Sequence, residues 1–85
     1  MSASAAGATL REAVRAATQA LQAAGIVEAA GDARRRVAAA CGGDGLVLIR
    51  EPERVLNAGE AGRLAELIGR RTAREPVARI LGWRE

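Results

Sequence analysis

Histidine, lysine, phenylalanine and tyrosine are absent from these 85 residues, and the chain has one cysteine and one tryptophan. A single cysteine cannot form a disulfide within the chain, and no zinc site can be assembled from it without histidine. General acid–base chemistry would have to come from carboxylates, and no two of them are spaced like a catalytic pair. The absences argue against a complete enzyme and favour a reducing, intracellular compartment.

Long apolar segments are also lacking. No run approaches the roughly 20 residues that span a bilayer, so no membrane partner is expected. Residues 1–8 are small and carry no basic side chain. They lack the apolar block of a secretory signal, and Glu12 argues against a transit peptide. We therefore expect residues 1–8 to form a disordered tail and the protein to be cytoplasmic.

What the chain does contain favours helices. It has 21 alanines, all 13 basic residues are arginine, and only 18 residues are valine, isoleucine or leucine. Alanine and arginine are strong helix formers, whereas burying alanine contributes little hydrophobic free energy. The composition predicts an all-α domain with a thin core and low stability. Because the net charge is only +3, the position of each arginine matters more than the total.

The first helix has clear ends in the sequence. Thr9 and Glu12 have the spacing of a capping box, and Gly25 followed by Ile26 is typical of a helix stop. One apolar stripe runs between these ends at helical spacing, and it consists of Leu10, Val14, Ala17, Leu21 and Ala24. We interpret this helix as part of the core.

A second helical region covers about residues 27–41, and Gly31 could break it, with Asp32 capping its second half. The arginines at 34–36 spread around this helix, and Arg36 falls beside its thin apolar side of Ala33, Val37 and Ala40. We interpret these arginines as a solvated face, with the Arg36 stem over the core. The alternative is an anion or RNA contact. If the first interpretation holds, Arg36→Leu should stabilise the domain.

Between 41 and 57 the pattern is irregular. We expect Cys41 to be a small buried hydrophobe and residues 42–45 to be a loop, which lacks the features of a phosphate-binding loop. Residues 46–49 are apolar and predict one or two helical turns buried on all sides. Asn57 and Glu60 mark the start of the next helix.

The helix after Asn57 has the apolar stripe Ala61, Leu64, Leu67 and Ile68. Glu66 and Arg70 form an i,i+4 pair on it. Pro76 predicts that this helix ends by about Arg74 and that another short one follows, ended by Gly82. The fold is therefore predicted to be an all-α bundle of about five short helices over residues 9–82, with residues 83–85 starting a linker.

The basic residues gather at the C-terminal end of the chain. Arginines near a helix C-terminus can simply complement the helix dipole, and that accounts for them structurally. The alternative is a partner-binding site, for which the candidate residues are Arg70, Arg71, Arg74, Glu75 and Trp83.

The order of these motifs resembles the N-terminal domain of the HemK/PrmC family, the protein-(glutamine-N5) methyltransferases that modify peptide chain release factors. The resemblance covers about residues 9–85. It rests on Thr9-Leu10-Arg11-Glu12-Ala13, Ala24-Gly25-Ile26, Asp32-Ala33 followed by Gly42, Arg70-Arg71, Arg74-Glu75-Pro76-Val77-Ala78 and Leu81-Gly82-Trp83-Arg84-Glu85. The family usually has apolar residues where Arg35 and Arg36 stand.

The resemblance implies a small helical bundle joined to a Rossmann-like catalytic domain that uses S-adenosylmethionine. The catalytic motifs are absent from these 85 residues, so no cofactor is expected in this chain. The implied role is to position the release factor, with the protein's own catalytic domain as a second partner. Two alternatives remain: an arginine-rich module that binds RNA or another protein, and a purely structural bundle. Without an aromatic platform for bases, direct nucleic-acid binding is disfavoured.

Overall fold

The computed structural model describes residues 7–43 and 45–80, with side chains up to residue 73. The described residues form four helices, α1 (Leu10–Ala23), α2 (Ala29–Ala40), α3 (Leu46–Arg50) and α4 (Ala58–Ile80), and no strand. The all-α bundle predicted from composition and periodicity is therefore confirmed. Residues 1–6 of the predicted tail and the predicted linker at 83–85 lie outside the described residues.

Both ends of α1 follow the sequence signals. Thr9 accepts a hydrogen bond from the Glu12 N–H, and Glu12 accepts one from the Thr9 N–H, at 3.1 and 3.0 Å. At the other end Gly25 has φ +84°, a conformation that glycine adopts at no steric cost. The N–H groups of Gly25 and Ile26 donate to Gln22 and Leu21, which is the Schellman arrangement.

The structure of α2 differs from the prediction in two ways. The helix is continuous through Gly31, and Asp32 does not cap it. Its N-cap is Glu28, which makes no side-chain capping bond. Because the helix begins at Ala29, Asp32 is its fourth residue. From that position its carboxylate is too far into the helix to reach the first N–H groups, and it bonds arginine side chains instead.

The short helix α3 forms where the apolar run predicted turns, but it is not buried on all sides. Val47 and Leu48 pack partly against the core, whereas Ile49 is 74% exposed. The physical reason is length, because five residues make little more than one turn. Such a turn can rest only one side on the bundle.

Helix α4 is longer than predicted. Asn57 and Glu60 form the expected reciprocal cap at its start. The expected end near Arg74 is wrong, because α4 continues through Glu75 and Pro76 to Ile80. Proline removes one backbone donor, and the arginine- and alanine-rich residues on both sides favour continuing the helix across this single gap. Among the described helices, none is both long and apolar enough to cross a membrane.

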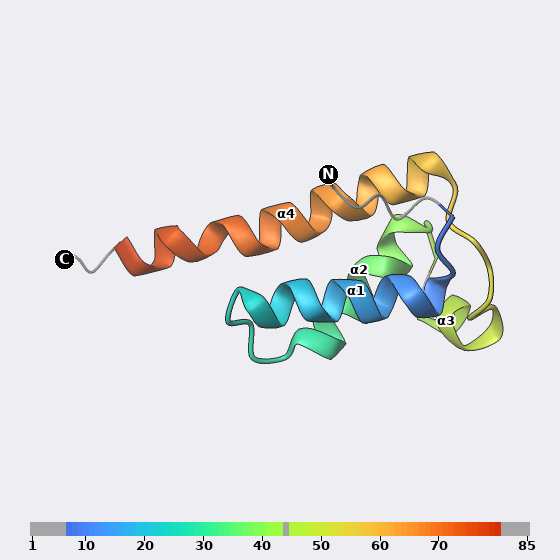
Figure 1. Cartoon of the computed structure of the whole chain (residues 1–85), viewed down its shortest axis with the longest axis horizontal. Helices are drawn as coiled ribbons and strands as arrows, with labels where there is room; N and C mark the ends of the chain where they lie inside the picture. Colours follow the sequence, from blue (N-terminus) through green and yellow to red (C-terminus); the bar gives the residue numbers. More distant parts are fainter. Residues whose placement is uncertain (1–6, 44, 81–85) are drawn as a thin grey trace.

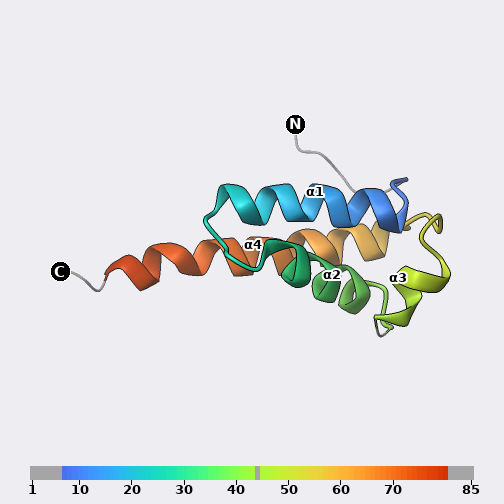
Figure 2. The ribbon, with the colours of Figure 1, turned by 90° about the horizontal axis from the view of Figure 1, so that it is seen from below.

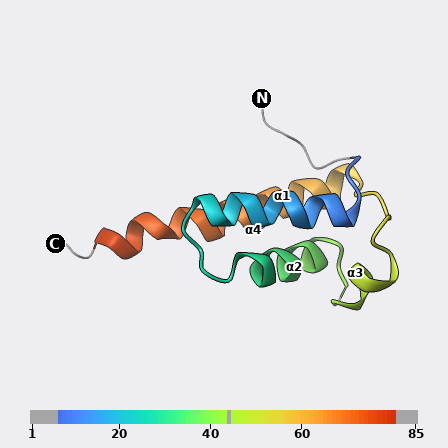
Figure 3. The ribbon, with the colours of Figure 1, turned by 60° about the horizontal axis from the view of Figure 1, so that its bottom comes forward.

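The helices pack as a small bundle in which α2 contacts both α1 and α4. Helices α1 and α4 run in the same direction, α2 runs back, and the C-terminal part of α4 extends past the others (Figures 1 and 2). The view in Figure 3 separates α2 from the α1–α4 pair. The beginnings of α1 and α4 are joined by backbone bonds, since the N–H groups of Gly7 and Leu56 donate to Leu56 and Ala8.

The core is divided into two connected clusters. The cluster near the start of α1 and α4 contains Leu10, Ala13, Val37, Ala40, Leu56 and Leu64, and the other contains Ala17, Leu21, Ile26, Ala29 and Ala33. Val14 and Ile68 pack against both clusters and connect them. Nearly half of these buried residues are alanine, which confirms the thin core predicted from composition.

Candidate functional site

A buried carboxylate lies between two helices of this bundle. The Asp32 side chain on α2 is only 6% exposed and receives three arginines. Arg35 and Arg36, one turn further along α2, donate to its Oδ1 at 2.7 and 2.9 Å. Arg71 of α4 donates from Nε to Oδ2 at 3.0 Å, and it lies 39 residues away in the sequence.

The charge state of Asp32 follows from these contacts. Its burial alone raises the pKa, but the hydrogen bonds and positive charges of the three arginines outweigh burial. The pKa of Asp32 therefore lies below its ordinary value of 3.8. A carboxylate that is ionised at neutral pH and fully satisfied can be buried at tolerable cost. The cluster is thus a fixed charge that ties α4 to α2.

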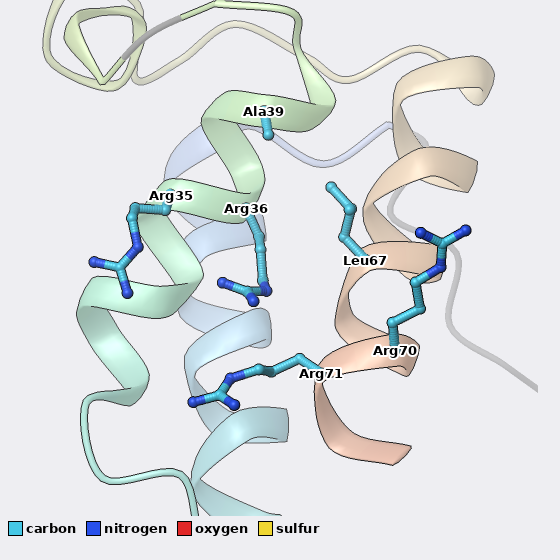
Figure 4. Close-up of a pocket in the computed structure, with 6 residues that line it drawn as sticks. All are labelled: Arg35, Arg36, Ala39, Leu67, Arg70 and Arg71. Carbon is cyan, nitrogen blue, oxygen red and sulfur yellow. The ribbon is translucent and has the colours of Figure 1, made fainter. Parts of the chain in front are cut away.

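A groove opens beside this cluster, between α2 and α4. It has a volume of about 500 Å³ and is lined by Arg35, Arg36, Ala39, Leu67, Arg70 and Arg71. Figure 4 shows Arg36 and Arg71 reaching into the space between the two helices, with Leu67 pointing into it from α4. Arg70 lies at the edge, where it pairs with Glu66 at 2.7 Å.

The candidate residues named from the sequence are only partly brought together. Arg70 and Arg71 line the groove. Arg74 and Glu75 belong to α4, but their side chains lie outside the described part, as does the whole of Trp83. Since α4 runs on to Ile80, Arg70 and Arg71 are not in its last turn, and the helix dipole does not account for them.

Asp32 was missed as a site residue, and part of the signal was present in the sequence. Arg35 and Arg36 follow it at i+3 and i+4, which is the spacing of ion pairs on one helix face. Arg34 and Arg35 are exposed, and the Arg36 side chain is only 26% exposed, in agreement with a solvated face that has the Arg36 stem over the core. The prediction did not include the bond from the Arg36 guanidinium to Asp32. The expectation that Arg36→Leu stabilises the domain took no account of this ion pair, which the substitution would remove.

Other chemistry in the described part of the chain is sparse. Among these residues no group of three or more metal-ligating side chains occurs. Cys41 is half-buried against the first core cluster, as a small hydrophobe would be. Burial, together with the charge of Glu60, raises the pKa of its thiol, which keeps it protonated and unreactive at neutral pH.

The fold and the groove define a class: a small all-α domain with an arginine-lined groove between two of its helices. Residues 12–82 match the PrmC N-terminal domain family. The chain is 44% identical over 79 residues to the release factor glutamine methyltransferase of Bradyrhizobium diazoefficiens, covering 93% of this chain and 27% of that protein. It is 40% identical over 78 residues to the enzyme of the same name from Agrobacterium fabrum, covering 92% of this chain and 27% of that protein.

No solved structure matches the chain. The family match covers most of the sequence, so the chain belongs to the PrmC N-terminal domain family. It spans about a quarter of the length of the curated relatives it matches.

Proposed function

We propose that this domain recognises the substrate of a release factor glutamine methyltransferase and is not catalytic by itself. Two curated relatives carry that enzyme name, and the chain corresponds to about a quarter of each. The observation that carries the proposal is the arginine-lined groove between α2 and α4, which leaves charged and apolar groups open to a partner. In this proposal the partner is a peptide chain release factor in the cytoplasm.

The methyl transfer is assigned to the rest of such a protein. S-adenosylmethionine, the methyl donor that the resemblance implies, binds in Rossmann-like domains at a glycine-rich turn after a strand. Residues 7–43 and 45–80 contain no strand to carry such a turn, so we assign no cofactor site to them. The second proposed partner is the protein's own catalytic domain.

Arg70 and Arg71 are the proposed contact residues whose side chains are described, and both line the groove. The proposal also retains Arg74, Glu75 and Trp83, which follow along the chain. Arg71 has a structural role as well, because it binds Asp32. Arg70 is therefore the better residue for testing recognition without disturbing the fold.

The test is a calorimetric titration of the 85-residue chain with a purified bacterial release factor and, separately, with a random RNA, each at 50 and 200 mM salt. We expect the release factor to bind at both salt concentrations and Arg70→Gln to weaken that binding. No binding of the release factor at either concentration would overturn the proposal. RNA binding that collapses at the higher salt would instead identify a polyanion-binding module.

A further inference from the structure

The Asp32 cluster contains far more hydrogen-bond donors than its carboxylate can accept. Three guanidinium groups carry fifteen N–H donors, whereas one carboxylate offers about four acceptor sites. The contacts to Asp32 use Nε of Arg71, Nη1 of Arg36 and Nη2 of Arg35. Three positive charges therefore surround one negative charge, and a second anion would relieve their mutual repulsion.

The guanidinium groups are held in place before any ligand arrives. Arg36 and Arg71 are 26% and 22% exposed, so each is largely fixed by packing and by Asp32 yet still open to solvent. A donor that is already ordered loses less conformational entropy when it binds an acceptor. Asp32 acts here as a positioning residue, because it orients two arginines from different helices toward one groove.

Two exposed arginines at the rim of the groove can bind a further carboxylate. Arg70 pairs with Glu66, but both side chains are mostly exposed, at 72% and 59%. Exposed pairs of this kind contribute little free energy, so Arg70 can exchange Glu66 for another carboxylate at small cost. Arg35, which is 68% exposed, is equally accessible on the α2 side.

The floor of the groove is apolar. Leu67 points from α4 into the space between the helices, and Ala39 lines the groove on α2, further along that helix than Arg36. A volume of about 500 Å³ fits a few side chains rather than a helix. Charged walls over an apolar floor suit a segment that carries carboxylates on either side of an aliphatic side chain.

We propose that the groove between α2 and α4 binds an acidic peptide segment of the partner protein. Carboxylates of the segment pair with Arg35, Arg36 and Arg70, and an aliphatic side chain rests on Leu67. The assignment of this segment to a release factor rests on the proposed function, whereas the chemistry of the groove does not.

A nucleic acid fits the same groove less well. Residues 7–43 and 45–80 have no aromatic side chain on which a base could stack. Outside the groove, Arg54 is held by Glu60 in a pair whose side chains are only 33% and 14% exposed, so Arg54 does not extend the groove into a phosphate track. The apolar floor also has no counterpart in phosphate binding.

The experiment uses the ¹⁵N-labelled 85-residue chain and an acetylated, amidated peptide, Glu-Glu-Glu-Leu-Glu-Glu-Glu. We expect the peptide to shift amide signals at residues 35, 36, 39, 67, 70 and 71. The variant R35Q/R70Q should raise the Kd about fivefold, as expected for two solvent-exposed charge pairs. The matched control R15Q/R50Q removes the same charge from exposed arginines of α1 and α3 that do not line the groove.

The outcomes separate this inference from the proposed function. If both double variants weakened peptide binding equally, the peptide would be bound by overall charge, and the proposal that the groove is its binding site would be overturned. Tighter binding of a uridine dodecanucleotide than of the peptide at the same residues would assign the groove to nucleic acid and overturn it too. A release factor that binds R35Q/R70Q as well as the wild type would overturn the groove's role but leave the proposed function intact. If the groove binds the peptide but the chain binds no release factor, the inference stands and the proposed function is overturned.

Discussion

At the residue scale, Asp32 is the side chain whose chemistry depends most on its surroundings. Its pKa is lower in the folded chain than in the unfolded chain, so the unfolded chain binds more protons at acidic pH. Its contribution to stability is therefore complete above the unfolded pKa and is lost as pH falls through the folded pKa. The window of loss begins near pH 4, close to the ordinary value of 3.8.

Asp32→Asn tests whether Asp32 loses its contribution to stability as the pH falls. The amide keeps the shape but lacks the charge, so we expect a loss of about 2 kcal/mol of unfolding free energy at pH 7. The difference between wild type and variant should shrink as the pH is lowered from 5 to 2, because Asp32 becomes neutral. Urea unfolding at a series of pH values measures it. A difference that stays constant down to pH 2 would contradict an ionised Asp32 in the native state.

Arg36→Leu separates packing from the ion pair. The leucine gains apolar burial beside Leu67 but loses the bond to Asp32. We expect the change in unfolding free energy caused by Arg36→Leu to depend on residue 32. It should be less favourable by about 1 kcal/mol in the chain with Asp32 than in the Asp32→Asn chain. A double-mutant cycle of unfolding free energies gives this coupling. Arg34→Leu provides the control, since Arg34 is exposed and not bound to Asp32, and its cycle should give no coupling.

At the scale of the elements, α1 and α4 depend on side chains that satisfy their first N–H groups. Thr9→Ala removes one half of the capping box and should cost about 1 kcal/mol. Thr18, in the middle of α1, only donates to the Val14 carbonyl within the helix. Thr18→Ala should therefore change stability by less than about 0.5 kcal/mol. Chemical denaturation of both variants compares the two threonines, and equal losses would contradict a specific role for the cap.

The long helix α4 shows how one element joins separate parts of the chain. Its first turns carry Ala61 and Leu64 into the core, and two turns later Arg71 reaches Asp32. Its continuation through Pro76 takes the helix beyond the other three (Figure 1). The groove therefore lies on the part of α4 that is fixed by the bundle on one side and open on the other.

At the scale of the whole molecule, stability depends on few large side chains. Leu21 is completely buried, and Leu21→Ala should cost about 3 kcal/mol. A chain of this length has only about 4–13 kcal/mol in total, so the variant should approach the limit of folding. Ile49, 74% exposed on α3, is the matched control, and Ile49→Ala should cost under about 0.5 kcal/mol. Thermal unfolding followed by circular dichroism measures both, and similar losses would contradict the exposure of α3.

Much of this architecture was determined by the sequence alone. Thr9 with Glu12, Asn57 with Glu60, and Gly25 mark helix ends because capping and positive φ are local properties of the backbone. The stripes of α1 and α4 identified the core because a helix repeats every 3.6 residues wherever it packs. The Glu66–Arg70 pair also follows from local spacing.

Only the tertiary structure decided the rest. Helix continuity through Gly31 and Pro76 depends on a balance between one weakened position and the flanking helix, which local rules do not resolve. The exposure of Ile49 depends on how little of the bundle a short helix can touch. The Asp32–Arg71 contact joins residues 39 positions apart, and no local pattern encodes it. The groove exists because packing α4 against α2 brings arginines from both helices to one buried carboxylate.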